Sequence, residues 1–193
     1  MARKKQYIEK DVIDKAMQLF WRNGYKNTSM QMLEKEMGIN KFSIYARFGN
    51  KQGIFLESLK CYKGRISTIF KNFKQSQKGR MAIKDFFYDS VAICSKEGHH
   101  KGCLITTTYM EFSESEDDVI NNQMTEFIHQ LKELFIEKLR IDTPKNEETL
   151  LREANFLLLA KHGLAAASRV NSKQEIEDYI ETTFKHIQTF IRP

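Results

Sequence analysis

The sequence predicts an all-α protein, and three of its features indicate this class. The chain of 193 residues contains only two prolines and nine glycines, and 41% of its residues are hydrophobic. These hydrophobic residues recur at the three- to four-residue spacing of amphipathic helices. No stretch alternates β-branched and polar residues between turn signals, so we expect no sheet. No apolar run approaches about 18 residues, so we expect no membrane-spanning segment.

The first helix is predicted over about residues 8–23. Gly24 is expected to end it, because glycine readily adopts the left-handed conformation that closes many helices. The N-terminal Met-Ala-Arg-Lys-Lys leads into this helix without the apolar core of a secretory signal. One face of the helix should be buried, and its residues are Val12, Ile13, Ala16, Leu19 and Phe20.

Two short helices joined by a tight turn are predicted between Thr28 and Lys51. Thr28 and Gln31 have the spacing of a capping box, so the first of the two is expected to begin at Thr28. Gly38 follows the apolar positions of this helix and is expected to end it. Asn40 has the side chain of an N-cap and is expected to begin the second helix.

The second of these short helices has two different faces. Ile44 and Phe48, four residues apart, are expected to point into the core. Phe42 and Tyr45 could instead pack in the core, but Ile44 and Phe48 already provide the inward-facing side chains of this helix. Cations, hydroxyls and aromatic rings on the other face suit the groove of a nucleic acid, namely Lys41, Phe42, Ser43, Tyr45 and Arg47. The pair of helices is therefore predicted to be a helix-turn-helix, a motif that reads DNA.

The distribution of charge supports this interpretation. The chain carries 31 Lys and Arg against 25 Asp and Glu, a formal net charge of +6. Residues 1–51 contain eleven of the cations and five of the anions, so the whole excess lies in this segment. A solvated basic surface is the alternative, but the coincidence with the motif favours contact with DNA phosphates.

Six further helices are expected after the motif. The first passes out of the basic segment without a Pro or Gly cluster, so a helix should join a DNA-binding domain (1–51) to a second domain (52–193). The polar stretch 71–80 is expected to end that helix. The expected ranges are about 51–70 with Asn50 as cap, 81–96, 103–112, 118–140 with Ser115 as cap, 147–170, and a last helix capped by Ser172 and Glu175.

No sequence feature indicates an enzyme or a cofactor. Glycine-rich phosphate loops and nucleophile motifs are absent from the sequence. The cysteines at 61, 94 and 103 lack the spacing of metal ligands, and their odd number suits the reducing cytoplasm. Cys103 has two interpretations, a redox sensor or a small packing residue, and the second is favoured. His99 and His100 are expected to be solvated loop residues.

A set of residues spread over about residues 8–56 forms a recognisable pattern. It consists of Ala16-x-x-Leu19-Phe20, Gly24-Tyr25-x-x-Thr28-Ser29, Gly38-Ile39, Ile44-Tyr45-x-x-Phe48-x-x-Lys51 and Phe55. In this pattern the sequence resembles the TetR family of transcriptional regulators. The resemblance implies a nine-helix, two-domain, Ω-shaped homodimer with an N-terminal helix-turn-helix. Its head would bind DNA, and its body would bind a small effector and dimerise.

The resemblance also implies roles for residues of the head. The start of the second helix would face a phosphate. The first turn of the recognition helix would read base edges, and the residues after it would contact the backbone or flanking bases. The expected DNA-binding residues are Thr28, Ser29, Lys41, Phe42, Ser43, Tyr45, Arg47 and Lys51.

Two sites are predicted in the body. Aromatic residues and a few polar groups suggest an effector cavity lined by Tyr62, Ile66, Phe86, Phe87, Thr106, Thr107, Tyr109, Phe127 and His162. Because no Arg or Lys cluster falls among these positions, the effector should be neutral or weakly charged and largely apolar. Small and apolar residues of the last two helices suggest a dimer interface made by Phe156, Ala160, Gly163, Leu164, Ala167, Ile180, Phe184 and Ile187.

Two functions remain open from the sequence. The first is a ligand-responsive regulator, most simply a repressor, that binds a palindromic operator in double-stranded DNA as a dimer. The second is an effector-independent structural or division-linked DNA-binding protein whose body is solidly packed. A closed apolar cavity with a few inward polar groups would favour the first.

Overall fold

The computed structural model describes residues 9–95, 101–113, 118–142 and 146–189. The described residues form helices and no strands, so the prediction of an all-α fold is confirmed. No helix among them combines the length and the apolarity needed to cross a membrane. The helices are α1 (Glu9–Asn23), α2 (Met30–Met37), α3 (Lys41–Phe48), α4 (Lys51–Gln75), α5 (Arg80–Ser95), α6 (Leu104–Phe112), α7 (Asp118–Asp142), α8 (Glu147–Ala167) and α9 (Lys173–Thr189).

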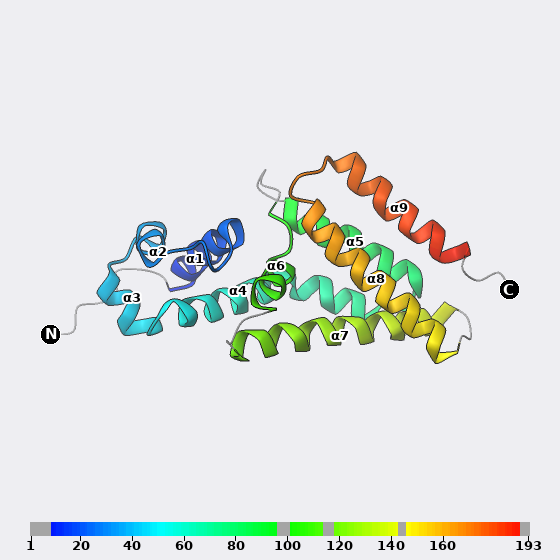
Figure 1. Ribbon diagram of the computed structural model, residues 1–193, viewed down its shortest axis with the longest axis horizontal. Helices are drawn as coiled ribbons and strands as arrows, with labels where there is room; N and C mark the ends of the chain where they lie inside the picture. Colours follow the sequence, from blue (N-terminus) through cyan, green and yellow to red (C-terminus); the bar gives the residue numbers. More distant parts are fainter. Residues whose placement is uncertain (1–8, 96–100, 114–117, 143–145, 190–193) are drawn as a thin grey trace.

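Three short helices, α1 to α3, lie at one end of an elongated molecule (Figure 1). We call residues 9–50 the head and the helices from α5 onward the body. Helix α4 begins under the head and runs lengthwise into the body, where it meets α5, α6 and α7. A single helix therefore belongs to both parts.

Helix α4 is longer than expected. The polar stretch at 71–80 does not end it at Phe70, and it continues to Gln75. The reason is the buried Phe73, which extends the inner stripe of Ile66 and Phe70 by one more turn. The lysines and the asparagine of this stretch occupy the exposed face, so they are compatible with a helix.

Most other helix ends follow their capping residues. Ser172 and Glu175 form the expected capping box: the Ser172 backbone N–H donates to the Glu175 carboxylate at 2.8 Å, and the Glu175 N–H donates to the Ser172 hydroxyl at 3.3 Å. Helix α8 ends at Ala167, three residues earlier than expected. The predicted cap at Ser115 lies outside the described residues.

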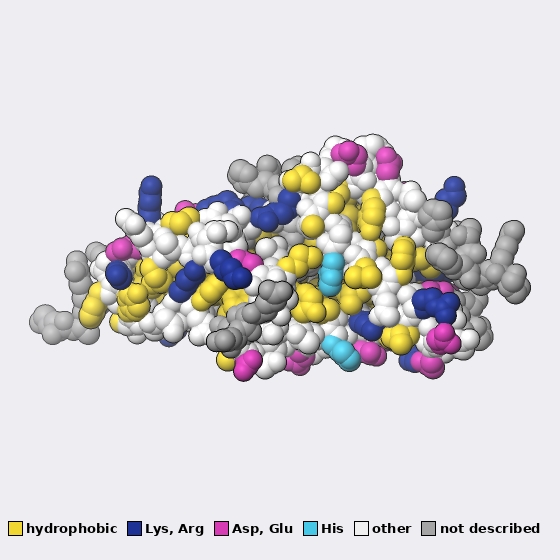
Figure 2. Space-filling model, viewed as in Figure 1, with side chains coloured by type: hydrophobic (Ala, Val, Ile, Leu, Met, Phe, Trp, Pro, Cys, Tyr) yellow, Lys and Arg dark blue, Asp and Glu magenta, His cyan; other side chains and the backbone are white. Residues whose placement is uncertain are grey.

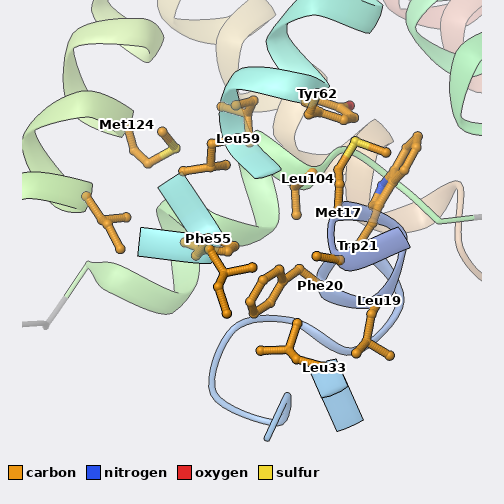
Figure 3. Packing of buried hydrophobic residues seen from close by; sticks show 14 of the residues in the cluster. Met17, Leu19, Phe20, Trp21, Leu33, Phe55, Leu59, Tyr62, Leu104 and Met124 are labelled. Carbon is orange, nitrogen blue, oxygen red and sulfur yellow. The ribbon is translucent and has the colours of Figure 1, made fainter. Parts of the chain in front are cut away.

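One hydrophobic cluster joins the head to the body. Phe20 and Trp21 of α1 pack against α4, where Phe55 and Tyr62 meet them edge to face. The same cluster continues into α6 through Leu104 and into α7 (Figure 3). The head and the body therefore share one continuous hydrophobic core.

Polar contacts reinforce this junction at both ends of α6. At its start, the Trp21 indole N–H donates to the carbonyl of Gly102 at 2.9 Å. At its end, the Glu111 carboxylate accepts the backbone N–H groups of Tyr25 and Lys26 at 2.8 and 2.9 Å. A carboxylate that accepts two amide protons makes strong, charge-assisted hydrogen bonds. Helix α6 thus holds the α1–α2 turn.

The position two residues before α6 must be glycine. Gly102 has a φ of +68°, and a Cβ atom there would lie 2.5 Å from the carbonyl oxygen of Ala165 in α8. The close approach of the two backbones is what lets the Gly102 carbonyl reach Trp21. A side chain would both strain the backbone and push α8 away.

We expect Gly102→Ala to lower the free energy of unfolding by at least about 1–2 kcal/mol, the cost of a left-handed alanine, with the clash adding to it. Gly64→Ala is the matched control, because this glycine lies inside α4 with open space around its Cα. The control should stabilise by about 0.5–1 kcal/mol. Urea unfolding of both variants is the measurement, and equal effects would contradict the assignment.

Candidate nucleic-acid interface and internal cavity

The turn between α2 and α3 is built by local hydrogen bonds. Helix α2 ends at Gly38, which has a φ of +68° and donates its N–H to the carbonyl of Glu34. The Asn40 side chain caps α3 by accepting the N–H of Ser43 at 2.8 Å. The Glu34 carboxylate also accepts the N–H of Lys41 at 2.8 Å, which ties the two helices together. The predicted helix-turn-helix is therefore present, with its second helix held at a defined angle.

The buried side of the motif contains only apolar side chains. Leu33 and Ile44 are fully buried and Met37 is nearly so. These three form part of the cluster shared with α1 and α4. Substitutions of these three residues would therefore affect stability. The polar and charged groups that a ligand could contact lie on the opposite face of the motif.

The opposite face of α3 is strongly exposed. Phe42 is 82% exposed and Tyr45 is 43% exposed, although both are large aromatic residues. The Lys41 ammonium lies 5.8 Å from the centre of the Tyr45 ring. The alternative for Phe42 and Tyr45, packing in the core, therefore does not hold in this structure. Exposed rings beside a cation are a surface on which a nucleic acid can dock.

Arg47 and Lys51 lie at the edge of this face, and each is engaged within the chain. The Arg47 guanidinium donates to the Glu9 carboxylate of α1, with its Nε 3.0 Å from Oε1. The Lys51 ammonium lies 4.3 Å from the centre of the Tyr25 ring. Burial lowers the pKa of Lys51, and the nearby Glu111 acts in the opposite sense.

The predicted start of α2 at Thr28 is wrong by one residue. Ser29 is the N-cap, and its hydroxyl accepts the N–H of Met32 at 3.2 Å. Thr28 is fully buried, and its hydroxyl donates to the carbonyl of Gly24 at 2.6 Å. The Thr28 side chain therefore closes the α1–α2 turn and cannot reach a phosphate, whereas Ser29 remains exposed.

The body contains a small cavity between α4, α5, α6, α7 and α8. Its free volume is about 30 Å³, enough for one or two water molecules and far below the roughly 300–1,000 Å³ of typical ligand sites. The cavity is predominantly apolar. Its lining consists of Tyr62, Ile66, Ile69, Phe70, Phe86, Ser90, Ile93, Cys94, Cys103, Ile105, Thr106, Phe127, Ile128, Leu131, Lys161 and His162.

The structure brings together most of the predicted cavity residues but not all of them. Phe87 is fully buried on another face of α5, where its ring packs on Phe135 and Phe184. Thr107 and Tyr109 of α6 are not among the residues that line the cavity. Those three assignments are wrong for this cavity. The residues that do line it are Tyr62, Ile66, Phe86, Thr106, Phe127 and His162.

Three chemically important lining residues are not among the cavity residues that the sequence predicts, namely Cys94, Cys103 and Lys161. Lys161 stands in an apolar run of α8, and this isolated cation was the available signal. Its side chain is 6% exposed and lines the cavity. One cation, Lys161, therefore stands among the lining residues.

His162 supplies a second polar group without a partner. Its Nε2 atom is buried and has no hydrogen-bond partner in the structure. Burial lowers the pKa of the His162 imidazole, and the positive charge of Lys161 lowers it further. The ring lies 5.9 Å from that of Tyr109. An uncharged imidazole is therefore available at the wall of the cavity.

The predicted dimer interface is only partly available. Five of its side chains pack inside the chain, mostly in the core between α5, α7, α8 and α9, and are not accessible to a second copy: Ala160, Leu164, Ile180, Phe184 and Ile187. That part of the prediction is wrong, because the apolar stripes of α8 and α9 face each other. Phe156, Gly163 and Ala167 remain at least partly exposed.

Other apolar residues continue the exposed strip on α8. Leu159 is 69% exposed, and Tyr179 of α9 is 41% exposed beside it with its hydroxyl donating to the carbonyl of Ala160. Hydrophobic side chains gather in Figure 2 over the part of the molecule where α8 lies in Figure 1. Contiguous apolar surface of this kind marks an interaction site in many proteins.

A helix-turn-helix with an exposed, cationic and aromatic second helix defines a DNA-binding protein. Residues 12–58 match the family model for bacterial regulatory proteins of the tetR family. These residues therefore carry the DNA-binding domain of the TetR family, whose members are DNA-binding transcriptional regulators and not enzymes.

Curated relatives and a solved structure agree with this assignment. The HTH-type transcriptional regulator YezE of Bacillus subtilis is 29% identical over 112 residues, and the transcriptional repressor ComR of Escherichia coli is 28% identical over 121 residues. These matches cover 58% and 62% of this chain, and 58% of the length of each relative.

The TetR family regulator CifR, solved as a variant with 26-bp operator DNA, superimposes with a TM-score of 0.83. The match covers 95% of this chain and 98% of that one at 21% identity, a level that concerns the fold.

We expect Phe87→Ala to destabilise the protein by about 3–5 kcal/mol, because it empties a fully packed position. Phe127→Ala is the matched control: this ring is only half-buried and borders the cavity. Its cost should stay within the common range of about 0.5–3 kcal/mol. Denaturant unfolding that ranks the two variants in the reverse order would contradict the assignment of core and cavity wall.

Proposed function

We propose that this chain is a cytoplasmic, ligand-responsive transcriptional regulator, acting as a repressor, that binds a palindromic operator as a homodimer. A small, largely apolar effector would release it from DNA. The observation that carries this proposal is the exposed face of α3, where Lys41, Phe42 and Tyr45 project from a capped and rigid helix-turn-helix. Large exposed aromatic residues on a recognition helix have no role in the isolated chain.

The proposed DNA contacts follow from where the side chains lie. Lys41 is suited to the O6 and N7 acceptors of guanine, and Phe42 to the methyl group of thymine. Ser29 and the free N–H groups at the start of α2 favour a phosphate. Arg47 would exchange its carboxylate partner Glu9 for the DNA backbone, and the exposed Tyr45 would contact flanking positions. Lys51 and Ser43 complete the proposed surface.

The proposed division of labour places DNA binding in residues 1–51 and effector binding and dimerisation in residues 52–193. Support comes from the excess of positive charge in the first segment and from the cavity in the second. The two are not independent folding units in this proposal. They share one hydrophobic cluster, and α4 runs through both.

The proposed dimer uses the exposed strip on α8 and α9. Phe156, Leu159, Gly163 and Ala167 provide an apolar surface with small residues that permit close helix approach, and Tyr179 borders it. A two-fold interface of this kind pairs the strip with its own copy. Two heads related by that symmetry would meet half-sites about 34–36 Å apart, one turn of DNA, or somewhat more if the heads are splayed.

The proposed effector site is the cavity between α4 and α8. Among the described residues, the partnerless Nε2 of His162 favours a ligand over a solidly packed body, because buried polar groups are normally hydrogen-bonded. The present volume of about 30 Å³ corresponds to a closed state. An effector that opens it would push on Tyr62 and Ile66 of α4 and move the head. A difference in binding free energy of about 1–3 kcal/mol between the two states would suffice to change operator occupancy.

Selection of bound duplexes from a randomised DNA library provides the operator, and it should be palindromic. On that duplex, Lys41→Ala should cost about 1–3 kcal/mol and relax the preference at one position in each half-site. Lys51→Ala should weaken binding to all sequences alike. It should also reduce by about one the slope of the logarithm of the binding constant against the logarithm of the salt concentration. Fluorescence anisotropy at several salt concentrations measures both effects.

Lys173→Ala is the control for charge, because this exposed lysine lies on α9 in the body. It should leave operator affinity unchanged. Recovery of no enriched sequence from the library, or equal losses for all three variants, would overturn the assignment of the head.

Leu159→Glu should shift the protein from dimer to monomer, because it places a charge in the centre of the proposed interface. Val119→Glu is the matched control on α7, where this apolar residue is 52% exposed and lies outside the strip. Light scattering at micromolar concentration distinguishes the states. The proposed interface is incorrect if the unchanged protein is a monomer or if Leu159→Glu remains a dimer.

A further inference from the structure

The hydroxyl groups that line the cavity of the body already have partners. Tyr62 donates to the Cys103 sulfur at 3.6 Å, and Thr106 hydrogen-bonds the same sulfur. The Ser90 hydroxyl donates to the carbonyl of Phe86. All three hydroxyl residues belong to the lining. A ligand would therefore find these groups engaged, and the polar groups open to it come from α8.

Lys161 of α8 brings an ammonium group to this mainly apolar lining. Its side chain is 6% exposed, and no Asp or Glu stands among the described residues that line the cavity. Its ammonium lies 6.0 Å from the centre of the Phe86 ring, the outer limit of a cation–π contact. A buried charge is costly unless it is paired or hydrogen-bonded. The cavity therefore contains a cation to which its own lining supplies no carboxylate.

His162, the next residue of α8, adds a hydrogen-bonding group to the same wall. Its Nε2 atom is buried and has no hydrogen-bond partner among the described residues. Burial lowers the pKa of the imidazole, and the positive charge of Lys161 lowers it further. An uncharged imidazole that carries its proton on Nε2 donates one hydrogen bond. Two adjacent residues therefore offer donors to one group of a ligand.

These donors and the apolar lining define which ligand fits. A single negative charge would neutralise Lys161, whereas a second one would be left unpaired in apolar surroundings. An uncharged molecule would leave the ammonium without an anion. A carboxylate has two acceptor oxygens, one for each donor. Since most of the remaining lining is hydrocarbon, the rest of the ligand should be apolar.

We infer that the cavity binds a small organic monocarboxylate, whose carboxylate accepts hydrogen bonds from the Lys161 ammonium and from Nε2 of His162. The inference rests on the proposed function, since it names the chemical class of the effector. Charge-assisted hydrogen bonds of this kind are stronger than those between neutral groups. Alcohols, amides and esters of the same hydrocarbon lack the negative charge and should bind weakly.

The hydrocarbon part of the acid connects its binding with α4. A free volume of about 30 Å³ holds one or two water molecules, so the hydrocarbon must displace side chains that it meets. Tyr62, Ile66 and Phe70 of α4 are among the side chains that line this space. Because Tyr62 also packs on Trp21 of the head, a bound acid would change how α4 supports α1.

Isothermal titration calorimetry of the full chain with acids and their own amides tests the inference. The panel contains butyrate, hexanoate, octanoate and benzoate at neutral pH, each paired with the amide of the same hydrocarbon. At least one acid should bind at least about tenfold more tightly than its amide, because the amide lacks the charge that pairs with Lys161. Failure of every acid to bind more tightly than its amide would refute the inference.

Variants of the cavity wall assign the contacts. Lys161→Met should weaken binding of the best acid at least about tenfold and leave that of its amide unchanged, and Lys161→Arg should retain much of the affinity. His162→Phe removes Nε2 and should weaken the acid at least about threefold. Lys63→Met is the matched control, because the Lys63 ammonium lies 5.9 Å from the centre of the Phe127 ring but the residue does not line the cavity. Equal losses in Lys161→Met and Lys63→Met would contradict the site.

Urea unfolding gives a second readout. Lys161→Met removes a buried charge from an apolar wall, and such replacements are often neutral or stabilising. Without added acid, the midpoint of unfolding should therefore not fall in this variant. Saturating acid should raise the midpoint of the wild-type chain but not that of Lys161→Met. A lower midpoint in the empty variant would show that Lys161 already stabilises the protein without a ligand, which would overturn the inference.

Operator binding separates this inference from the proposed function. The best acid should lower the affinity of the wild-type chain for the selected duplex at least about tenfold, but not that of Lys161→Met. A wild-type chain that binds no duplex would refute the proposed function, whatever the acid does. A chain that binds the duplex but binds no acid better than its amide would refute this inference alone.

Discussion

The hydrophobic cluster around the first half of α4 is the interaction on which the rest of the structure depends. Phe20 and Trp21 of α1 pack on Phe55 and Tyr62, and the same cluster takes in α6 and α7. The burial of an aromatic ring contributes a few kilocalories per mole, so several rings outweigh any single polar contact at the surface. The three head helices are too short to be stable alone, and packing against α4 stabilises them.

This sharing of a core has a functional consequence. A head connected by a flexible linker could not respond to a ligand in the body. Here Tyr62 contributes to the head cluster with one side and to the cavity wall with another. Glu111 adds a polar contact at the far end of α6, where a Cβ at Gly24 would lie 2.9 Å from its carboxylate. Movement at the cavity therefore has two routes to α3, one apolar through α4 and one polar through α6.

The cavity combines features that a stable core normally avoids. Among the described residues, its lining includes a largely buried lysine without a carboxylate partner and an imidazole nitrogen without a hydrogen-bond partner. A buried polar nitrogen without a partner is unfavourable, because its desolvation is not compensated. Proteins retain such groups where a ligand or a reaction uses them. The unfavourable terms also make the closed state easier to open, because water or a ligand would solvate the polar groups.

Local interactions explain how much could be predicted from the sequence. Helical periodicity, the caps Asn40 and Ser172 and the glycine at Gly38 predicted the class and most of the helices, because each depends on residues a few positions apart. The exposed side of α3 could also be predicted from the sequence, since Ile44 and Phe48 define its inner side. Thr28 was misassigned because Thr28 and Ser29 are both good caps, and only the packing of the α1–α2 turn selects between them.

Tertiary structure decided what residues far apart in the chain do together. Periodicity places Ile180 and Phe184 on the apolar face of their helix. It does not show whether that face packs against α8 of the same chain or against α8 of a second copy. Aromatic content suggested a cavity, yet Phe86 lines it and the adjacent Phe87 does not, because they occupy different faces of α5. The meeting of Cys103 with Lys161 and Tyr62 depends on the relative placement of three helices, and no local pattern in the sequence specifies such placement.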